Sequence, residues 1–213
     1  MSRRLSEVIE SIGKQGGIAL STGYKVEFDF SKRSTSGLQA NLKKCLPGNA
    51  KFDEDGFISL ACSEAQLPSI SSQTGTTQGY WTGEGQVNFA NGRIFTDTSL
   101  GWYCDKNMSP MRFLQTWHDY IYIDYGNDFV GPSGTVNPTR RNNTQVRYPE
   151  QYQATIKVTK LDLGDEPSLV VTMVDAFPYS IDATPLSYGT SQLVNVSANF
   201  YFSKYFVEYA PKI

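Results

Sequence analysis

The sequence predicts a mainly β protein of the α+β class: a two-sheet sandwich or barrel-like domain with one packed central helix and a short N-terminal helix. The first observation is composition, since 13 Tyr, 12 Phe and 18 Gly among 213 residues are typical of strands and turns. The second is that several segments alternate apolar and polar residues, and the third is one central segment with helical periodicity. This length suits one core, so we expect a single domain over residues 1–213.

The N-terminal part predicts a short amphipathic helix followed by strands. Before Gly13 the helix has apolar residues at helical spacing, namely Leu5, Val8, Ile9 and Ile12. Residues 24–30 alternate strictly, as in a half-buried strand. Residues 31–55 are rich in Ser, Gly, Lys and Asn and predict a surface excursion, a loop with one helical turn. Residues 57–62 predict a second strand.

A long polar stretch leads to the middle of the chain. Residues 69–83 are rich in Ser, Thr, Gln and Gly and predict an exposed loop, which carries Tyr80 and Trp81 near its end. Within residues 85–95 the dipeptide Asn91-Gly92 predicts a hairpin turn, because both residues tolerate positive φ. A strand should follow over residues 98–104, with Leu100 and Trp102 on one face.

The best helical signal lies in the centre of the sequence. Ser109 suits the N-cap position of a helix and Pro110 suits its first turn. An apolar stripe follows at helical spacing, made of Phe113, Leu114, Trp117 and Ile121. We therefore expect Leu114 and Trp117 in the core.

The last third of the chain predicts a second excursion and then strands. Residues 124–147 are rich in Gly, Pro, Asn and Arg and predict a surface excursion. Strands are expected over residues 152–161 and 169–174, with a polar turn between them. An irregular crossing should follow, framed by Phe177-Pro178 and Thr184-Pro185.

The closing segment, residues 193–209, alternates over an unusual length. Val196, Phe200 and Phe202 share one parity and are predicted to lie in the core. Phe206 has the same parity, so it is expected on the same face. The opposite face is polar, with Asn195, Ser197, Asn199 and Ser203.

The charge balance argues against a dedicated DNA-binding module. Lys and Arg total 19 and Asp and Glu total 21, a net charge of -2, so no large positive field attracts phosphates. A conduit through which DNA slides would have the same balance. The sequence has no signal peptide and no apolar run of membrane-spanning length. We therefore expect a protein made in a cytoplasm that does not itself bind membranes.

No constellation in the sequence predicts catalysis, a metal or a cofactor. Cys45, Cys62 and Cys104 are odd in number and irregularly spaced, so we expect free thiols rather than disulfides or a zinc site. His118 is the only histidine and is expected to be structural. The pairs Tyr80-Trp81 and Trp102-Tyr103 suggest an alternative, a stacking platform for sugars or bases. Core or interface roles are more usual for aromatic residues on a strand.

Four segments carry a resemblance to a known family. They are residues 62–68 (CSEAQLP), the polar loop and hairpin of residues 69–95, the helix with Phe113 and Trp117, and the C-terminal Pro-containing turn with its closing strand. In this order they resemble the tail tube proteins of contractile-tailed, T4-like bacteriophages and the related baseplate tube initiator proteins. The two excursions, residues 31–55 and 124–147, have no counterpart in that pattern.

The resemblance implies a non-enzymatic structural subunit of a phage tail tube, with a tail tube fold. Such subunits form hexameric rings that stack, and the lumen conducts DNA during ejection. The implied partners are other copies of the chain and the tail sheath, baseplate hub and tape-measure proteins. The implied location is the virion tail, assembled in the host cytoplasm. The alternatives are a baseplate tube initiator ring of the same fold and, in another class, a carbohydrate-binding or decoration module of a virion.

In a stacked tube the polar loop would find its partner in the next ring. Ordering a free loop costs about 1–2 kcal/mol of backbone entropy per residue, so a partner is needed to offset this cost. We expect the stacking contact to involve the following residues of the loop and hairpin: Thr74, Gly75, Gln78, Tyr80, Trp81, Asn91 and Gly92.

Overall fold

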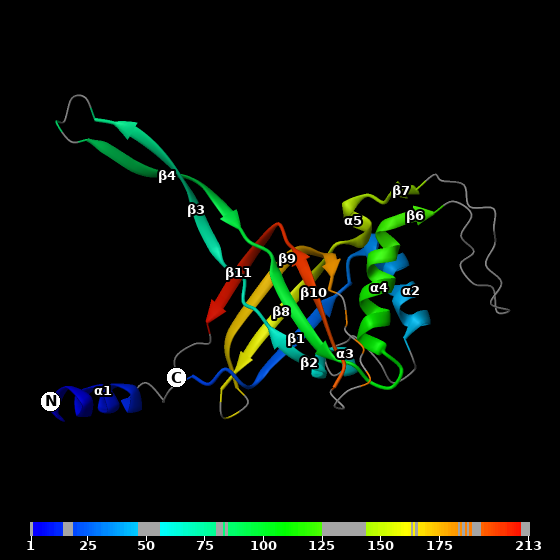
Figure 1. The fold of residues 1–213 in the computed structure, drawn as a ribbon, viewed down its shortest axis with the longest axis horizontal. Helices are drawn as coiled ribbons and strands as arrows, with labels where there is room; N and C mark the ends of the chain where they lie inside the picture. The colour runs from blue at the N-terminus through cyan, green and yellow to red at the C-terminus, as the bar shows by residue number, and fades with distance from the viewer. Residues whose placement is uncertain are drawn as a thin grey trace.

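Strands form the body of the molecule in the computed structural model, the helices α2, α4 and α5 gather at one end of it, and a long hairpin projects from the other (Figure 1). The structure describes residues 2–14, 19–46, 56–79, 83, 85–124, 144–162, 164, 166–182, 184, 186, 188 and 193–209. No helix within these ranges is long and apolar enough to cross a membrane.

One antiparallel sheet of seven strands makes up the body. Its order is β1 (Tyr24–Asp29), β8 (Ala154–Leu161), β9 (Pro167–Ile181), β10 (Asn195–Tyr201), β5 (Thr98–Tyr103) and β2 (Cys62–Ala65), and β11 (Lys204–Tyr209) also pairs with β9. β9 is shared, because its first part pairs with β8 and β11 and residues 177–181 pair with β10. We call β1, β8, β11 and the first part of β9 the first half-sheet. The second half-sheet is β2, β5, β10 and the last part of β9. The predicted mainly β fold with two sheets is confirmed.

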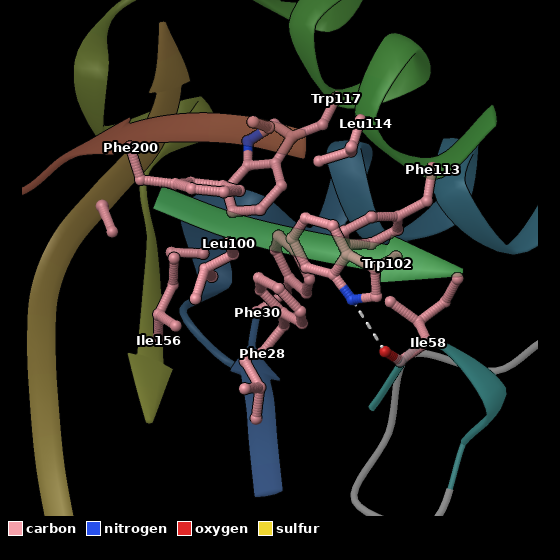
Figure 2. Packing of buried hydrophobic residues seen from close by; sticks show 14 of the residues in the cluster. Phe28, Phe30, Ile58, Leu100, Trp102, Phe113, Leu114, Trp117, Ile156 and Phe200 are labelled. Carbon is pink, nitrogen blue, oxygen red and sulfur yellow. Dashed lines mark hydrogen bonds between the residues drawn. The ribbon is translucent and has the colours of Figure 1, made fainter. Parts of the chain in front are cut away.

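The core lies where the inward faces of the half-sheets and the helices meet. Phe28 of the first half-sheet contacts Trp102 and Phe200 of the second, with ring centroids 6.1 Å and 6.4 Å apart. Trp102 also donates a hydrogen bond from Nε1 to the Ile58 carbonyl oxygen at 3.0 Å (Figure 2). Aromatic side chains therefore provide much of the buried apolar area that joins the two half-sheets.

The predicted central helix is present as α4 (Ser109–Ile121). Its stripe of Phe113, Leu114 and Trp117 is fully buried, and Trp117 Nε1 donates to the Tyr152 carbonyl oxygen at 2.8 Å. Ser109 is the first helical residue rather than the N-cap. The cap is supplied from one turn earlier, because the Asp105 carboxylate accepts hydrogen bonds from Ser109 N at 2.6 Å and Ser109 Oγ at 2.8 Å.

Residues 31–55 are not simply a surface excursion. They contain η1 (Arg33–Thr35) and α2 (Ser36–Cys45), and α2 packs on α4. Leu38 and Leu42 are fully buried and lie one turn apart, so they form the inward stripe of a helix whose polar residues face outward. The loop interpretation is wrong for this part, and residues 47–55 lie outside the described residues.

Residues 57–62 are also different from the prediction. They begin with a short helix, α3 (Phe57–Leu60), in which Ile58 is buried, and the strand β2 starts only at Cys62. A short apolar run has no distinctive period, so the sequence pattern does not separate a buried turn of helix from a strand.

The polar stretch before the central helix is a strand rather than a loop. β3 (Ile70–Gln78) pairs with β4 (Gln86–Phe95) over its whole length. The chain reverses between these strands, so the prediction of a turn at Asn91-Gly92 is wrong, because both residues lie within β4. Tyr80 and Trp81 lie outside the described residues.

The second excursion is described only at its two ends. β6 (Tyr122–Asp124) pairs with β7 (Thr144–Val146), and residues 125–143 lie outside the described residues. The end of the excursion contacts α4, because Arg147 Nε donates a hydrogen bond to the Tyr120 carbonyl oxygen at 2.8 Å. The Arg147 guanidinium also lies 4.2 Å from the centroid of the Tyr120 ring. After it comes the short helix α5 (Pro149–Tyr152).

Two further predictions are wrong in the C-terminal part. Phe177-Pro178 does not interrupt the sheet, because β9 continues to Ile181 and changes partner there from β8 and β11 to β10. The closing segment breaks at residues 202–203 into β10 and β11, and the break shifts the alternation. Tyr205 now pairs with buried Met173, while Phe206 points outward and is 51% exposed.

The predicted N-terminal helix is present as α1 (Ser2–Lys14). Val8 and Ile9 on this helix are exposed to solvent. Figure 1 shows α1 beside the body, away from the cluster of helices around α4.

Candidate assembly surface

The β3–β4 hairpin is exposed to solvent along nearly its whole length. Its ladder runs from the pair Ile70 and Phe95 at the base to the pair Gln78 and Gln86 at the far end. Figure 1 shows the hairpin extending well beyond the body of the sheet. A two-stranded ribbon is marginally stable in water, so a partner for its faces would stabilise it.

A β-bulge at Asn91 sets which side chains share a face of this hairpin. Gln73 pairs with Gly92 and Thr74 pairs with Ala90, which leaves Asn91 as the extra residue of β4. The extra residue inverts the alternation of β4 beyond it. The bulge therefore decides the face on which the base of β4 presents its side chains.

The inversion gathers three apolar side chains on one face. Val87, Phe89 and Ile94 pair with Thr77, Gly75 and Ser71, which alternate in one phase along β3. The three side chains are 43%, 50% and 47% exposed, in that order. We call Val87, Phe89 and Ile94 the hairpin stripe. The pair Gln73 and Gly92 lies between Phe89 and Ile94 on this face. Exposed apolar side chains gathered on one face indicate a contact with another molecule.

Phe89 lies across Gly75 on the neighbouring strand. A Cβ atom at Gly75 would come 2.8 Å from Phe89 Cζ, closer than real Cβ contacts. Gly75 thus leaves room for the ring, and this cross-strand contact fixes the position of Phe89.

The other residues expected at the stacking contact are spread over the hairpin. Thr74 and Gln78 are exposed on the face opposite the hairpin stripe. Asn91 forms the bulge and Gly92 follows it. The sequence interpretation missed the hairpin stripe, because the bulge hides the alternation between Val87, Phe89 and Ile94.

A second feature suited to assembly is a sheet edge. β11 pairs with β9 along one edge, and no strand in the described ranges pairs with its other edge. An open edge presents backbone donors and acceptors that another strand can pair with.

The residues expected in the core lie as follows. Leu114, Trp117 and Phe200 are fully buried (Figure 2), and Val196 is 1% exposed. Phe202 is half-buried at the margin of the core, where its ring lies 6.2 Å from Phe95 and 6.0 Å from Tyr205 by centroid.

The histidine and the cysteines of the described residues lie apart from one another. No group of three or more His, Cys, Asp or Glu side chains there is placed to hold a metal ion. His118 is half-buried beside the Tyr122 ring, at a centroid distance of 5.5 Å. The three cysteines are free, and burial raises the pKa of the Cys62 thiol to about 12.

The described residues also form an open pocket on the surface, lined by charged and polar residues. It has a volume of about 700 Å³ and is lined by Lys32, Ser34, Glu150, Gln153 and Asp175. Lys32 Nζ donates to Asp175 Oδ1 at 2.6 Å, and Ser203 Oγ donates to Asp175 Oδ2 at 3.1 Å. The hydrogen bond from Lys32 holds the pKa of Asp175 below its usual range. These contacts join Lys32, which precedes η1, to the part of β9 just before it changes partner.

Exposed apolar side chains on a projecting hairpin and an open sheet edge are surfaces through which copies of a chain can assemble. The family model for phage tail tube proteins matches residues 19–208, and the chain belongs to this family of structural tube proteins. A comparison with curated protein sequences finds no match.

Solved structures of contractile systems share the fold. The chain is similar to one in the cryo-EM structure of the anti-feeding prophage baseplate, with TM-score 0.56 and 12% identity over 90% of this chain and 95% of that chain. It is also similar to one in the cap that terminates the tube of the anti-feeding prophage, with TM-score 0.55 and 11% identity over 91% and 92%. A chain of the sheath-tube complex of the extracellular contractile injection system PVC gives TM-score 0.50 and 10% identity over 91% and 93%. At these identities the likeness shows the fold.

Proposed function

We propose that the chain is the non-enzymatic subunit of the inner tail tube of a contractile-tailed bacteriophage. Its copies form hexameric rings, the rings stack, and the lumen conducts DNA during ejection. The observation that carries this proposal is the hairpin stripe, three apolar side chains held in solvent on an ordered arm of a tail tube family protein.

The hairpin stripe supplies a contact that repeats around and along a tube. Fully burying a side chain of this size stabilises by about 1.5–3 kcal/mol, and these side chains are about half exposed, so covering each contributes roughly 1 kcal/mol. The gain per copy is modest, but every copy in a symmetric ring makes the same contact. The open edge of β11 offers a second contact, because ring closure pairs edges that are hazardous in a free subunit.

The proposed partners follow from this position in the tail. They are other copies of the chain, the sheath outside the tube, the tape-measure protein inside it and the baseplate hub at its end. The proposed location is the virion tail, after assembly in the host cytoplasm.

The purified full-length protein tests the proposal directly. Light scattering coupled to size exclusion at increasing concentration, with negative-stain electron microscopy, should show rings of six subunits and tubes built from them. A monomer that assembles neither alone nor with other tail proteins would argue strongly against a tube subunit.

A baseplate tube initiator ring is the second candidate, because a chain of a contractile baseplate has the same fold. Quantitative mass spectrometry of purified virions separates the two, since a tube subunit is present in many copies and an initiator in one ring.

A carbohydrate-binding module has less support. Trp102 is fully buried, so of the pair Trp102-Tyr103 only Tyr103 is exposed for stacking. Binding of the soluble protein to sugars on a glycan array would support this candidate.

A further inference from the structure

The helix α1 carries an apolar surface that its own chain leaves in solvent. Val8 and Ile9 are 53% and 62% exposed, and together with half-buried Ile12 they lie on one side of the helix. We call Val8, Ile9 and Ile12 the α1 stripe. A helix of 13 residues is marginally stable by itself in water, so a partner for the α1 stripe would stabilise it.

The match to the tail tube family does not account for this helix. The family model matches residues 19–208, so α1 (Ser2–Lys14) precedes the matched part of the chain. Figure 1 shows α1 outside the body, on the side where β1 begins.

The first half-sheet has an apolar margin that the core does not cover. Val158 of β8 and Val171 of β9 are buried, but Val207 of β11, which lies in the same row of the sheet, is 37% exposed. In the row at the end of the sheet, Tyr209 pairs with half-buried Leu169 and is 78% exposed. We call Leu169, Val207 and Tyr209 the rim.

The chain enters the first half-sheet at the end where the rim lies. Tyr24, the first residue of β1, pairs with Lys160, and Lys160 pairs with Leu169 of the rim. Lys160 Nζ donates to the carbonyl oxygens of Thr22 and Gly23 at 2.8 Å and 3.1 Å, so its ammonium group is directed at the backbone before β1. The segment that follows α1 therefore leads to this end of the sheet.

The charges near the two apolar surfaces are opposite. The turn between β8 and β9 and the end of β11 carry the exposed carboxylates Asp162, Glu166 and Glu208. The first turn of α1 has no acidic residue, and the sequence has Arg3 and Arg4 there. Cations at a helix N-terminus interact unfavourably with the helix dipole, so carboxylates from a partner would offset this effect.

We propose that the α1 stripe of one copy packs on the rim of a neighbouring copy in the assembled tube. The proposal rests on the proposed tube function. The partner is a second copy of the chain, because both surfaces are exposed in the single copy and their neighbouring charges are opposite. Each copy contributes one helix and receives another, so the contact repeats around a closed ring. In this arrangement α1 is an arm that links neighbouring subunits.

Disulfide cross-linking between two differently substituted copies tests this contact. The parent is Cys45→Ser, because Cys45 is the exposed native cysteine. One chain carries Ile9→Cys, and a second, isotope-labelled chain carries Tyr209→Cys; both positions are exposed, so the core should be undisturbed. Lys204→Cys is the matched control, an exposed position at the other end of β11. Mixed tubes are oxidised, and mass spectrometry identifies the linked peptides.

The expected product is a dimer in which position 9 of one copy is linked to position 209 of the other. Mixed tubes of the Ile9→Cys and Lys204→Cys chains should lack the corresponding dimer. A single chain that carries both Ile9→Cys and Tyr209→Cys should be linked into multimers in tubes, because each copy would then be joined to the next.

Other outcomes would overturn the proposal. Tubes without the link between positions 9 and 209 would overturn it and leave the tube function standing. A link within one doubly substituted chain would show that α1 packs on its own rim, and a link only between two copies of position 9 would show that α1 pairs with itself. Sedimentation of parent tubes with vesicles of anionic phospholipid, without the expected link, would identify a membrane as the partner. Failure of the parent to assemble in any tail preparation would overturn the proposed function together with this contact.

Discussion

At the scale of single residues, Phe200 lies at the point where the half-sheets and α4 meet. It is fully buried, and its ring lies 5.8 Å from Trp117 and 6.3 Å from Trp102 by centroid. Phe200→Ala would leave a cavity among rigid rings, so we expect it to lower the free energy of unfolding by about 3–5 kcal/mol. Urea unfolding measures this change. A loss well below 1 kcal/mol would show that the site collapses around the smaller side chain.

Asp175 contributes stability through its charge. Its backbone has φ 58, a left-handed conformation that Asn also tolerates, so Asp175→Asn removes the charge with little backbone strain. Because the folded-state pKa lies below the ordinary value of 3.8, the charge stabilises above about pH 4, and this contribution is lost as pH falls through the folded pKa. The variant should therefore be less stable than the parent at pH 7.

The difference between Asp175→Asn and the parent should shrink as pH falls below about 4. Thermal melting of both proteins from pH 7 to pH 3 measures it. Lys32→Met, which removes the donor to Asp175 Oδ1, should reduce stability in the same pH range. A constant difference at every pH would mean that the carboxylate charge plays no part.

At the scale of elements, a substitution on the β3–β4 hairpin should affect assembly of the tube and leave the stability of the fold unchanged. Phe89→Thr removes the central apolar side chain of the hairpin stripe, which lies on an arm outside the core, so we expect an unchanged thermal melt and a loss of tubes in electron micrographs. Threonine suits a strand, so β4 should persist.

Asn88→Thr is the matched control, because Asn88 is the neighbouring exposed residue on the opposite face of the same strand. This variant should form tubes like the parent. Normal tubes from Phe89→Thr would exclude the hairpin stripe from the assembly contact, and a lower melting temperature would show that Phe89 supports the fold instead.

At the scale of the whole molecule, β9 makes the two half-sheets depend on each other. Residues 167–176 belong to the first and residues 177–181 to the second, and Phe28 packs against both Trp102 and Phe200 across the core. We therefore expect the chain to unfold as one cooperative unit.

The probes for this expectation report on different parts of the fold. Tryptophan fluorescence reports on Trp102 and Trp117 in the core together with Trp81, and far-ultraviolet circular dichroism follows the strands. Their urea transitions in the monomer should coincide. Two separate transitions would show that the half-sheets unfold independently and that the chain has more than one domain.

The periodicity of apolar residues was enough to predict an element where that element faces the core along its whole length. The apolar stripe of α4 and the alternation of β5 and β10 each correspond to a buried face, so the sequence alone predicts these elements. The order of motifs typical of tail tube proteins can also be recognised in the sequence. Leu38 and Leu42 carried the same helical signal in α2, but polar residues between them obscured it.

The remaining features depend on contacts between distant residues. β3 is polar and becomes a strand because β4 pairs with it, and the bulge at Asn91 is defined only by that pairing. β9 continues through Pro178 because β10 lies beside it, and the break before β11 turns Phe206 outward. Strand pairing and facing are non-local, because the hydrogen bonds that decide them join residues far apart in sequence.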